Sequence, residues 1–243
     1  MKSEGNLAPT AFAPQVHSQH GIPPMSEVFP TCPSSFMPAR NQSLGISVSL
    51  VEDDPHTRQV LSDWIRPAYG FNLLNYHKTA ESALASLPSE NPSIVLIGLN
   101  LPGTDASKCV RQLKPILQQT QFVTLNEDED ADGIFGALAA GATGYLSRKA
   151  ARVELLGTLK LIHAGGSPMS GAIAKKVLHS FQNHSVSGTQ VELSPRENRI
   201  LRLLARGSSY NETAAALNIT LAMVSTYIRS IYEKLQLLSN AGI

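Results

Sequence analysis

The spacing of hydrophobic positions changes twice along the chain, and the changes divide its 243 residues into three regions. Residues 1–44 have no hydrophobic period and contain seven prolines among Ser, Gln and His. Residues 46–163 alternate short apolar runs with amphipathic stretches, and from residue 193 onward the spacing is helical. The first region cannot bury enough apolar surface to offset its conformational entropy, so we expect residues 1–44 to be a disordered, proline-rich tail.

The most apolar run of the middle region, residues 94–99, predicts a central strand. Four consecutive aliphatic residues, Ile94 to Ile97, stand shortly before a Pro-Gly turn signal, which is typical of a strand buried on both faces. Weaker runs predict four more strands, at residues 46–51, 71–76, 122–125 and 144–146. Helical stretches lie between and after them, at residues 55–64, 79–87, 105–118, 131–140 and 151–163.

This alternation predicts the fold class. Strands that alternate with helices form right-handed βαβ crossovers, so we expect an α/β fold with a doubly wound, five-stranded parallel sheet of order 2-1-3-4-5. Ligands of such sheets bind beyond the carboxyl ends of the strands, where the strand order reverses. The candidate site therefore lies at the ends of the first and third strands, and Gly98 stands near the end of the third.

The remainder of the chain predicts a second, smaller domain. A Gly-Gly-Ser-Pro break at residues 165–168 ends the first domain, which we place at residues 45–164. Residues 165–190 are then a linker with one amphipathic helix, 170–181, and residues 191–243 form a small all-α domain.

The all-α domain has the spacing of a helix-turn-helix. Its first helix begins at Pro195, a residue favoured in the first helical turn because its missing N–H has no partner there. A short helix over residues 211–217 and a longer one over 221–235, capped by Thr220, follow it. The turn of about four residues between the last two helices matches a helix-turn-helix, whose second helix enters the major groove of DNA.

Charge and cysteine content limit the possible binding partners and the cellular compartment of the protein. The formal net charge is +1, so any binding to nucleic acid must depend on local charge. Cys32 and Cys109 lack metal-ligand spacing, which suits a reducing compartment. No run approaches the ~20 apolar residues of a membrane span, and the N-terminus lacks the apolar core of a secretion signal. We expect a soluble, cytoplasmic protein that needs no cofactor and binds no membrane.

Four short motifs carry a resemblance to a known family: Leu50–Pro55, Leu99–Gly103, Ala137–Leu146 and Leu193–Glu197. Through them, residues 46–163 resemble the flavodoxin-like receiver domain of response regulators. Residues 193–243 resemble the helix-turn-helix output domain of the LuxR/NarL class. The resemblance implies a transcription regulator rather than an enzyme, with double-stranded DNA as its partner. It also implies a homodimer, or a heterodimer with another regulator.

The resemblance also implies the chemistry of the receiver site. A receiver holds Mg²⁺ with an acidic pair, which falls here on Glu52 and Asp53. The aspartate that accepts the phosphoryl group falls on Gly98, which has no side chain. The hydroxyl position falls on Asn126, and the lysine position falls on Arg148. Three of the five functional positions therefore depart from the family pattern.

The departure at Gly98 is the decisive one, because it removes the nucleophile. We expect no aspartyl phosphorylation at the usual place, and only weak Mg²⁺ binding by Glu52 and Asp53. An ordinary phosphorelay receiver that uses a neighbouring acceptor is an alternative, for which Asp54 and Asp105 are the candidates.

Two further features near the site allow two interpretations each. The acidic run 127–130, with Asp132, suits a helix N-terminus, whose dipole favours negative charge, or it mimics a phosphorylated state. Tyr145 matches the switch aromatic of the family, and it also suits a packed aromatic on an edge strand.

The output domain carries little positive charge. By resemblance, the helix over 221–235 reads the bases, and its DNA-contacting candidates are Ser225, Thr226, Arg229 and Lys234. Arg229 is the best candidate for a bidentate contact with guanine. Relatives often carry lysine or arginine at the positions of Asn211, Ser225 and Glu233. The net charge over 191–243 is +2, from six basic and four acidic residues, so we expect modest, salt-sensitive affinity.

Four arginines of the first helix of this domain are expected to form a solvated face; they are Arg196, Arg199, Arg202 and Arg206. We expect Arg196 to pair with Glu197 or Glu192. The alternative function is an interaction module that heterodimerises with another regulator and titrates it without productive DNA binding.

Overall fold

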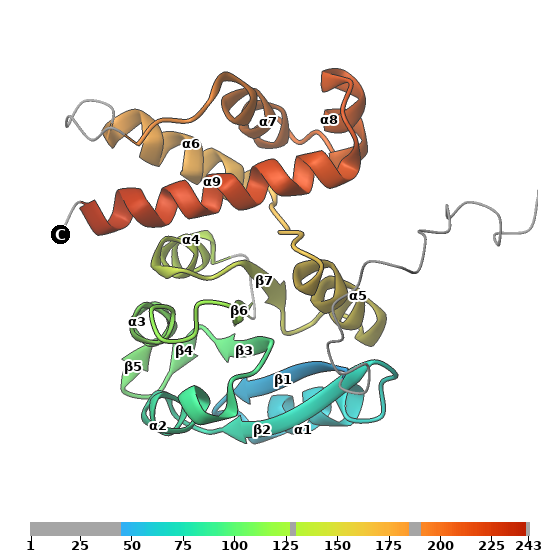
Figure 1. Cartoon of the computed structure of the whole chain (residues 1–243), viewed down its shortest axis with the longest axis vertical. Coiled ribbons are helices and arrows are strands. Elements are labelled where there is room, and N and C mark those ends of the chain that lie inside the picture. Colours follow the sequence, from blue (N-terminus) through green and yellow to red (C-terminus); the bar gives the residue numbers. More distant parts are fainter. Residues whose placement is uncertain (1–44, 127–129, 185–190, 242–243) are drawn as a thin grey trace, which may run out of the picture. The chain divides into compact units, whose positions relative to one another are not determined.

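The structure is a computed structural model that describes residues 45–126, 130–184 and 191–241 (Figure 1). The expected disorder of residues 1–44 lies outside this part of the chain, as does most of the acidic run 127–130.

A parallel sheet forms the centre of the first domain. Its strands are β1 (Ile46–Val51), β2 (Phe71–His77), β3 (Ile94–Gly98), β6 (Gln121–Asn126) and β7 (Gly144–Ser147). They pair in the order β2-β1-β3-β6-β7, all parallel, which confirms the predicted order. Every residue of β3 is buried, as its unbroken aliphatic run predicts.

Helices cover both faces of the sheet (Figure 1). They are α1 (Pro55–Ile65), α2 (Ala80–Glu90), α3 (Ala106–Leu113), α4 (Ala131–Ala140) and α5 (Arg152–His163). α1 and α5 share one apolar core with one face of the sheet, and α2, α3 and α4 share a second core with the other face. Cys109 lies in the second core, where burial raises the pKa of its thiol to about 11, so it is an inert core residue.

A short hairpin that the sequence pattern did not predict interrupts the third crossover. Strands β4 (Asn100–Leu101) and β5 (Thr104–Asp105) pair antiparallel around the Pro102–Gly103 turn. Because this hairpin takes up residues 100–105, α3 begins at Ala106, and it ends earlier than expected, at Leu113.

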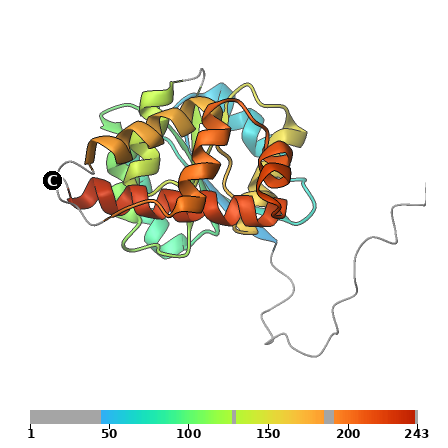
Figure 2. The same cartoon turned by 90° about the horizontal axis from the view of Figure 1, so that it is seen from above.

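Four helices follow: α6 (Gly171–His184), α7 (Pro195–Ala205), α8 (Tyr210–Leu217) and α9 (Leu221–Ala241). Seen from above, they gather into one orange-to-red group (Figure 2). α9 runs six residues beyond the predicted end at residue 235, because buried Leu238 continues the apolar spacing of Ile231 and Leu235.

The linker helix α6 packs against both neighbouring parts of the chain. Its apolar side, with Ile173, Val177 and Phe181, shares one core with Leu201 and Leu204 of α7. α6 also contacts α4 and α9. The helix of the expected linker therefore packs against the helical domain and also against α4 of the first domain.

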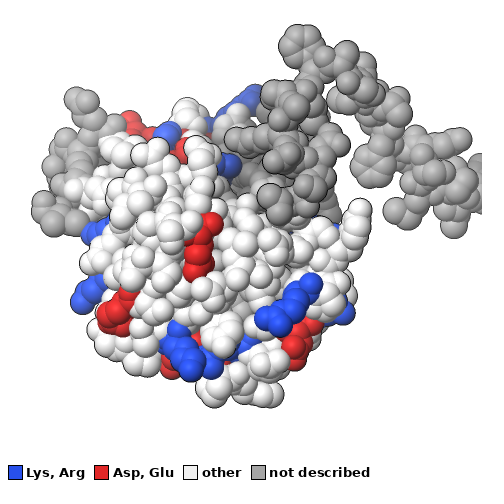
Figure 3. All heavy atoms as spheres, turned by 60° about the horizontal axis from the view of Figure 1, so that its bottom comes forward, with Lys and Arg blue, Asp and Glu red and all other residues white. Residues whose placement is uncertain are grey.

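Charges of both signs are interspersed on the face shown in Figure 3, with broad uncharged areas between them. Within the described ranges, no single helix has both the length and the apolar composition of a membrane span. One bent pair, α8 with most of α9, passes that test of length and composition, with 101° between its two helices.

Candidate functional site

The sheet brings the five predicted receiver positions together at one edge. Glu52 and Asp53 directly follow β1, Gly98 ends β3, and Asn126 ends β6. Arg148 comes directly after β7, and its backbone N–H donates to the carbonyl oxygen of Asn126 at 2.7 Å. Parallel strands place their carboxyl ends on the same side, so the topology alone accounts for this gathering.

The side chain of Arg148 fills the space beside Gly98. A Cβ atom built on Gly98 would lie 2.8 Å from Nη2 of Arg148 and 3.1 Å from Oε2 of Glu52. Real Cβ atoms essentially never approach other atoms within 3.0 Å, so a side chain at residue 98 would require the end of the flexible Arg148 side chain to shift. The guanidinium group of Arg148 thus lies beside the position at which the family resemblance predicts the acceptor aspartate.

Arg148 is held there by Glu52. Its Nη2 lies 3.0 Å from Oε1 of Glu52, and the same oxygen accepts a hydrogen bond from the backbone N–H of Asp54 at 3.1 Å. The Glu52 side chain is fully buried, and that of Arg148 is 13% exposed. Burial raises the pKa of Glu52, and the positive charge of Arg148 opposes that rise. The two residues form a buried ion pair in direct contact.

This arrangement offers few free oxygen ligands to a divalent cation. Mg²⁺ takes oxygen ligands, but the Glu52 carboxylate faces a cation, and residue 98 supplies no oxygen from a side chain. Across the residues that the structure describes, no group of three or more His, Cys, Asp or Glu side chains could hold a metal ion.

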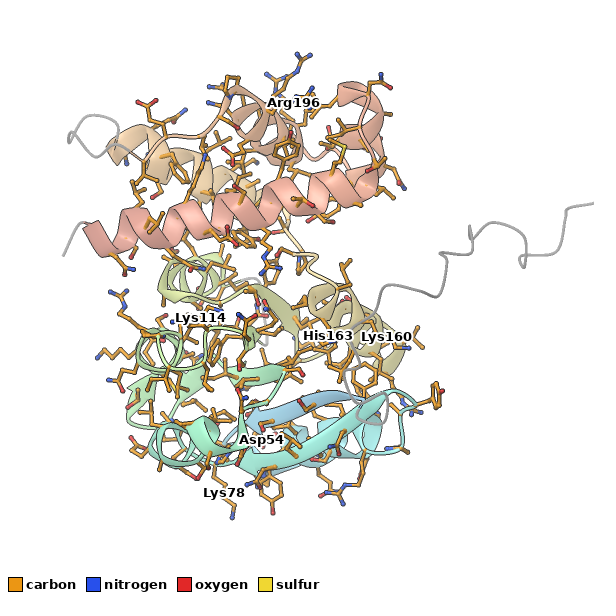
Figure 4. The ribbon with its side chains drawn as sticks, in the orientation of Figure 1. Asp54, Lys78, Lys114, Lys160, His163 and Arg196 are labelled. Carbon is orange, nitrogen blue, oxygen red and sulfur yellow. The ribbon has the colours of Figure 1, made fainter. Side chains whose placement is uncertain are left out.

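Both candidate substitute acceptors cap helices. Asp54 stands at the start of α1 (Figure 4), where its Oδ2 accepts the N–H of Thr57 at 2.6 Å. Hydrogen bonds from Thr57 hold the pKa of Asp54 below its usual range. Asp105 caps α3 by accepting the N–H of Ser107 at 3.1 Å. Both carboxylates are therefore already engaged by backbone N–H groups.

The described part of the acidic run also has structural partners. Asp130 caps α4 by accepting the N–H groups of Asp132 and Gly133. Asp132 pairs with Lys176 of α6 at 2.5 Å. These contacts match the helix-terminus interpretation of the acidic run for its described residues.

Tyr145 connects the end of the sheet to the start of α6. Its hydroxyl oxygen accepts the backbone N–H of Ser170, one residue before α6, at 2.6 Å. Beside it lies a cavity of about 460 Å³, whose wall includes Asn126, Pro168 and Ile173. Tyr145, the predicted switch aromatic, therefore contacts the segment that leads to the second domain.

The second domain has the expected helix-turn-helix. Asn218 takes the left-handed conformation at φ 51° and ends α8, and Thr220 caps α9 by accepting the N–H of Met223 at 3.2 Å. α7 and α8 each begin with a capping box, formed by Ser194 with Glu197 and by Ser209 with Glu212. The second box is visible in the sequence as a Ser and a Glu three residues apart, and it places the start of α8 one residue earlier than expected.

The DNA-contacting candidates of α9 have different surroundings. Thr226 and Arg229 are exposed, and Ser225 is half-buried. Nε of Arg229 lies 3.3 Å from Oε1 of Glu233, and its Nη1 lies 3.2 Å from where a Cβ on Gly165 would stand. Arg229 is thus paired within its own helix and lies beside the segment that follows α5.

Lys234 has a structural contact instead of a free ammonium group. Its Nζ lies 2.7 Å from Oε2 of Glu197, which is 3% exposed, and 3.0 Å from the carbonyl oxygen of Glu192. The expected pairing of Arg196 with Glu197 is wrong, because the Glu197 carboxylate turns inward to Lys234. Arg196 instead donates from Nη1 to the hydroxyl of Tyr227 at 3.4 Å.

A doubly wound domain with these strand-end positions, followed by a helix-turn-helix, defines a response regulator with a DNA-binding output domain. Residues 48–160 match the family model described as the response regulator receiver domain. Residues 191–243 match that of bacterial regulatory proteins of the luxR family. The chain belongs to the two-domain response regulators of the LuxR family, which are DNA-binding transcription regulators.

Curated relatives span both domains. The nitrate/nitrite response regulator protein NarL of Escherichia coli (strain K12) is 26% identical over 195 residues, covering 79% of this chain and 90% of NarL. The transcriptional activator protein ExaE of Pseudomonas putida is 28% identical over 203 residues, covering 82% of this chain and 94% of ExaE.

A solved structure supports the fold. The crystal structure of a two-component response regulator of the LuxR family from Aurantimonas sp. SI85-9A1 superposes with a TM-score of 0.51 at 24% identity. The match covers 56% of this chain and 96% of that one.

Proposed function

We propose that this regulator acts on DNA without phosphorylation of its receiver at residue 98. The observation that carries the proposal is the guanidinium of Arg148, which lies 2.8 Å from where a Cβ of residue 98 would stand and pairs with the buried carboxylate of Glu52.

Phosphoryl transfer needs both a nucleophile and charge stabilisation at this edge of the sheet. Gly98 offers no nucleophilic atom, and the carboxylate that would bind a cation is neutralised by the arginine. Asn126 offers an amide where relatives offer a hydroxyl. The changes are mutually consistent, since the end of the arginine side chain lies beside residue 98, where a glycine leaves room for it. The input signal is then a protein contact, a small ligand or the amount of the protein.

Acetyl phosphate with Mg²⁺ tests the receiver directly. We expect no mobility shift of the full chain on a phosphate-affinity gel, and the same DNA affinity with and without the phosphoryl donor. A relative that keeps its acceptor aspartate serves as the positive control. Asp54→Asn and Asp105→Asn variants are run in parallel. A phosphoryl group that appears in the unaltered chain and vanishes in either variant would mean a substitute acceptor and would overturn the proposal.

Genome-wide binding by the unmodified protein, with Arg229→Ala beside it, tests the DNA-binding half of the proposal. We expect discrete sites for the unmodified protein that the variant loses, because Arg229 is the exposed cation on the reading helix. The absence of sites for both proteins would contradict direct regulation.

The interaction module remains the second candidate function. It is favoured by the engagement of both cations of α9, since Arg229 pairs with Glu233 and Lys234 pairs with Glu197. In that case, footprinting at physiological salt gives no protection by this chain alone. Adding the chain to a LuxR-family regulator that does protect its site would weaken that protection.

A further inference from the structure

We infer that α7 carries a binding face for the phosphate backbone of duplex DNA, separate from the reading helix α9. We call it the α7 arginine face, and it consists of Arg196, Arg199, Arg202 and Arg206. The inference rests on DNA binding by this domain and names where much of the affinity for phosphate comes from.

The four arginines lie on one side of the helix. Their spacings of three, three and four residues keep them within about a third of the helix circumference. All four are exposed, whereas Ile200, Leu201 and Leu204 on the other side are buried. In Figure 4, Arg196 lies on the outside of α7. The arginines therefore form a continuous row along the 11-residue helix and its C-cap residue, Arg206.

No acid of α7 offsets this row. The only acid of the helix is Glu197, which is buried and bonded to Lys234, Ser230 and the backbone of Ser194. None of the ion pairs among the residues that the structure describes involves an arginine of this face. Nε of Arg202 donates to Oδ1 of Asn198 at 2.7 Å, which orients that guanidinium without neutralising it.

The row begins beside the reading helix. Arg196 contacts the hydroxyl of Tyr227 at 3.4 Å, and Tyr227 directly follows Thr226, an exposed residue of α9. When α9 enters a major groove, phosphate strands border it on both sides, and the Tyr227 contact holds Arg196 of α7 beside α9. A guanidinium group suits a phosphate, because it can donate two parallel hydrogen bonds.

α9 itself is poorly equipped for phosphate contacts. Its two cations have acidic partners, Arg229 with Glu233 and Lys234 with Glu197. Since phosphate contacts supply most of the sequence-independent affinity for DNA, another element of the domain must provide them. An acidic protein surface would also complement the arginine face, but DNA is the partner that this domain class has.

Salt dependence tests the inference with a probe of known chemistry. The probe is a fluorescein-labelled DNA duplex of arbitrary sequence, bound to the full-length protein at a series of salt concentrations. The test variant is Arg199→Gln/Arg202→Gln/Arg206→Gln, which leaves the Tyr227 contact of Arg196 in place. The matched control removes three exposed cations of the receiver domain: Arg66→Gln/Lys78→Gln/Arg152→Gln.

We expect the slope of log affinity against log salt to fall by roughly one for each phosphate that the variant no longer neutralises. The slope of the test variant should therefore be shallower by roughly two to three units and its affinity roughly tenfold weaker, while the control keeps both. Glutamine is a good helix former, so thermal melting should show both variants folded.

Three outcomes would overturn the inference. An unchanged slope in the test variant would mean that the arginines do not touch phosphate. If the test variant kept an unchanged slope and also failed to activate transcription in a reconstituted system, the arginine face would bind an acidic protein instead. If the unaltered protein did not bind the duplex at all, both this inference and direct regulation of DNA would fail, whereas the acetyl phosphate test would stand by itself.

Discussion

Nη2 of Arg148 lies 3.0 Å from Oε1 of Glu52, beside the position where a Cβ of residue 98 would stand. The pair joins residues 96 positions apart, at the ends of β1 and β7. It therefore contributes to the fold as well as to the chemistry of the site, and each role leads to a prediction.

Restoring the aspartate alone should fail to restore phosphorylation. In Gly98→Asp, the new side chain would begin 2.8 Å from the guanidinium of Arg148, so it would pair with the arginine rather than accept a phosphoryl group. In Gly98→Asp/Asn126→Thr/Arg148→Lys, the shorter cation and the hydroxyl match the family pattern, and we expect labelling by acetyl phosphate. A phosphate-affinity gel compares the two variants. Full labelling of the single variant would show that the arginine does not block the site.

Removing the arginine should destabilise the receiver domain. Arg148→Met leaves the fully buried Glu52 without its cation, and we expect a loss of about 3 kcal/mol in the free energy of unfolding. Adding Glu52→Gln should recover most of the loss, because no buried charge then remains. Urea unfolding measures both, with Arg111→Met, an exposed position of α3, as the control. Equal stability of the Arg148→Met variant and the unaltered protein would contradict a buried ion pair.

Acid should remove the contribution of Glu197. Burial alone would raise the pKa of this carboxyl group, but hydrogen bonds from Lys234, Ser194 and Ser230 hold it below its ordinary value. Its stabilisation is therefore present above the ordinary glutamate pKa and is lost as the pH falls through the folded-state pKa.

Glu197→Gln should accordingly lower stability at neutral pH, and its deficit should shrink as the pH falls below the ordinary glutamate pKa. Urea unfolding at a series of pH values measures this, with Glu154→Gln at an exposed position of α5 as the control. A deficit that stays constant with pH would argue against the ionic contacts of Glu197.

Tyr145→Phe should loosen the start of α6. The substitution removes the acceptor for the Ser170 N–H and keeps the ring, so we expect a local loss of about 1 kcal/mol. Amide hydrogen exchange at Ser170 should then be roughly fivefold faster. Tyr76→Phe, on the exposed side of β2, should leave that exchange unchanged. An unaltered rate at Ser170 in Tyr145→Phe would mean that the hydrogen bond does not hold this segment.

Most of the fold follows from local pattern. The aliphatic run of β3 and the Pro and Thr residues at the starts of α1 and α2 predict these elements to within a few residues. The sequence pattern does not predict the hairpin around Pro102–Gly103, because its two-residue strands are too short to show a period. The end of α9 was placed too early, although Leu238 continues its apolar spacing.

The candidate site was predictable in its positions and not in its contacts. Topology brings Glu52, Gly98 and Arg148 to one edge, but the pattern does not say where a long flexible side chain goes. Whether the arginine turns to Glu52 or to solvent depends on the space beside Gly98, which only the packed structure shows. The inward turn of Glu197 is a similar case, because its neighbour Arg196 offered an equally suitable partner on the surface.

The pair of Arg148 and Glu52 also affects how long a regulatory response lasts. An aspartyl phosphate has a limited lifetime, because it hydrolyses. The regulator then returns to its inactive state without new protein synthesis. An ion pair between two side chains of the same chain has no such decay. If the amount of the protein is the input, the duration of a response would be the lifetime of the protein molecule itself, and its strength would be the number of molecules that the cell contains.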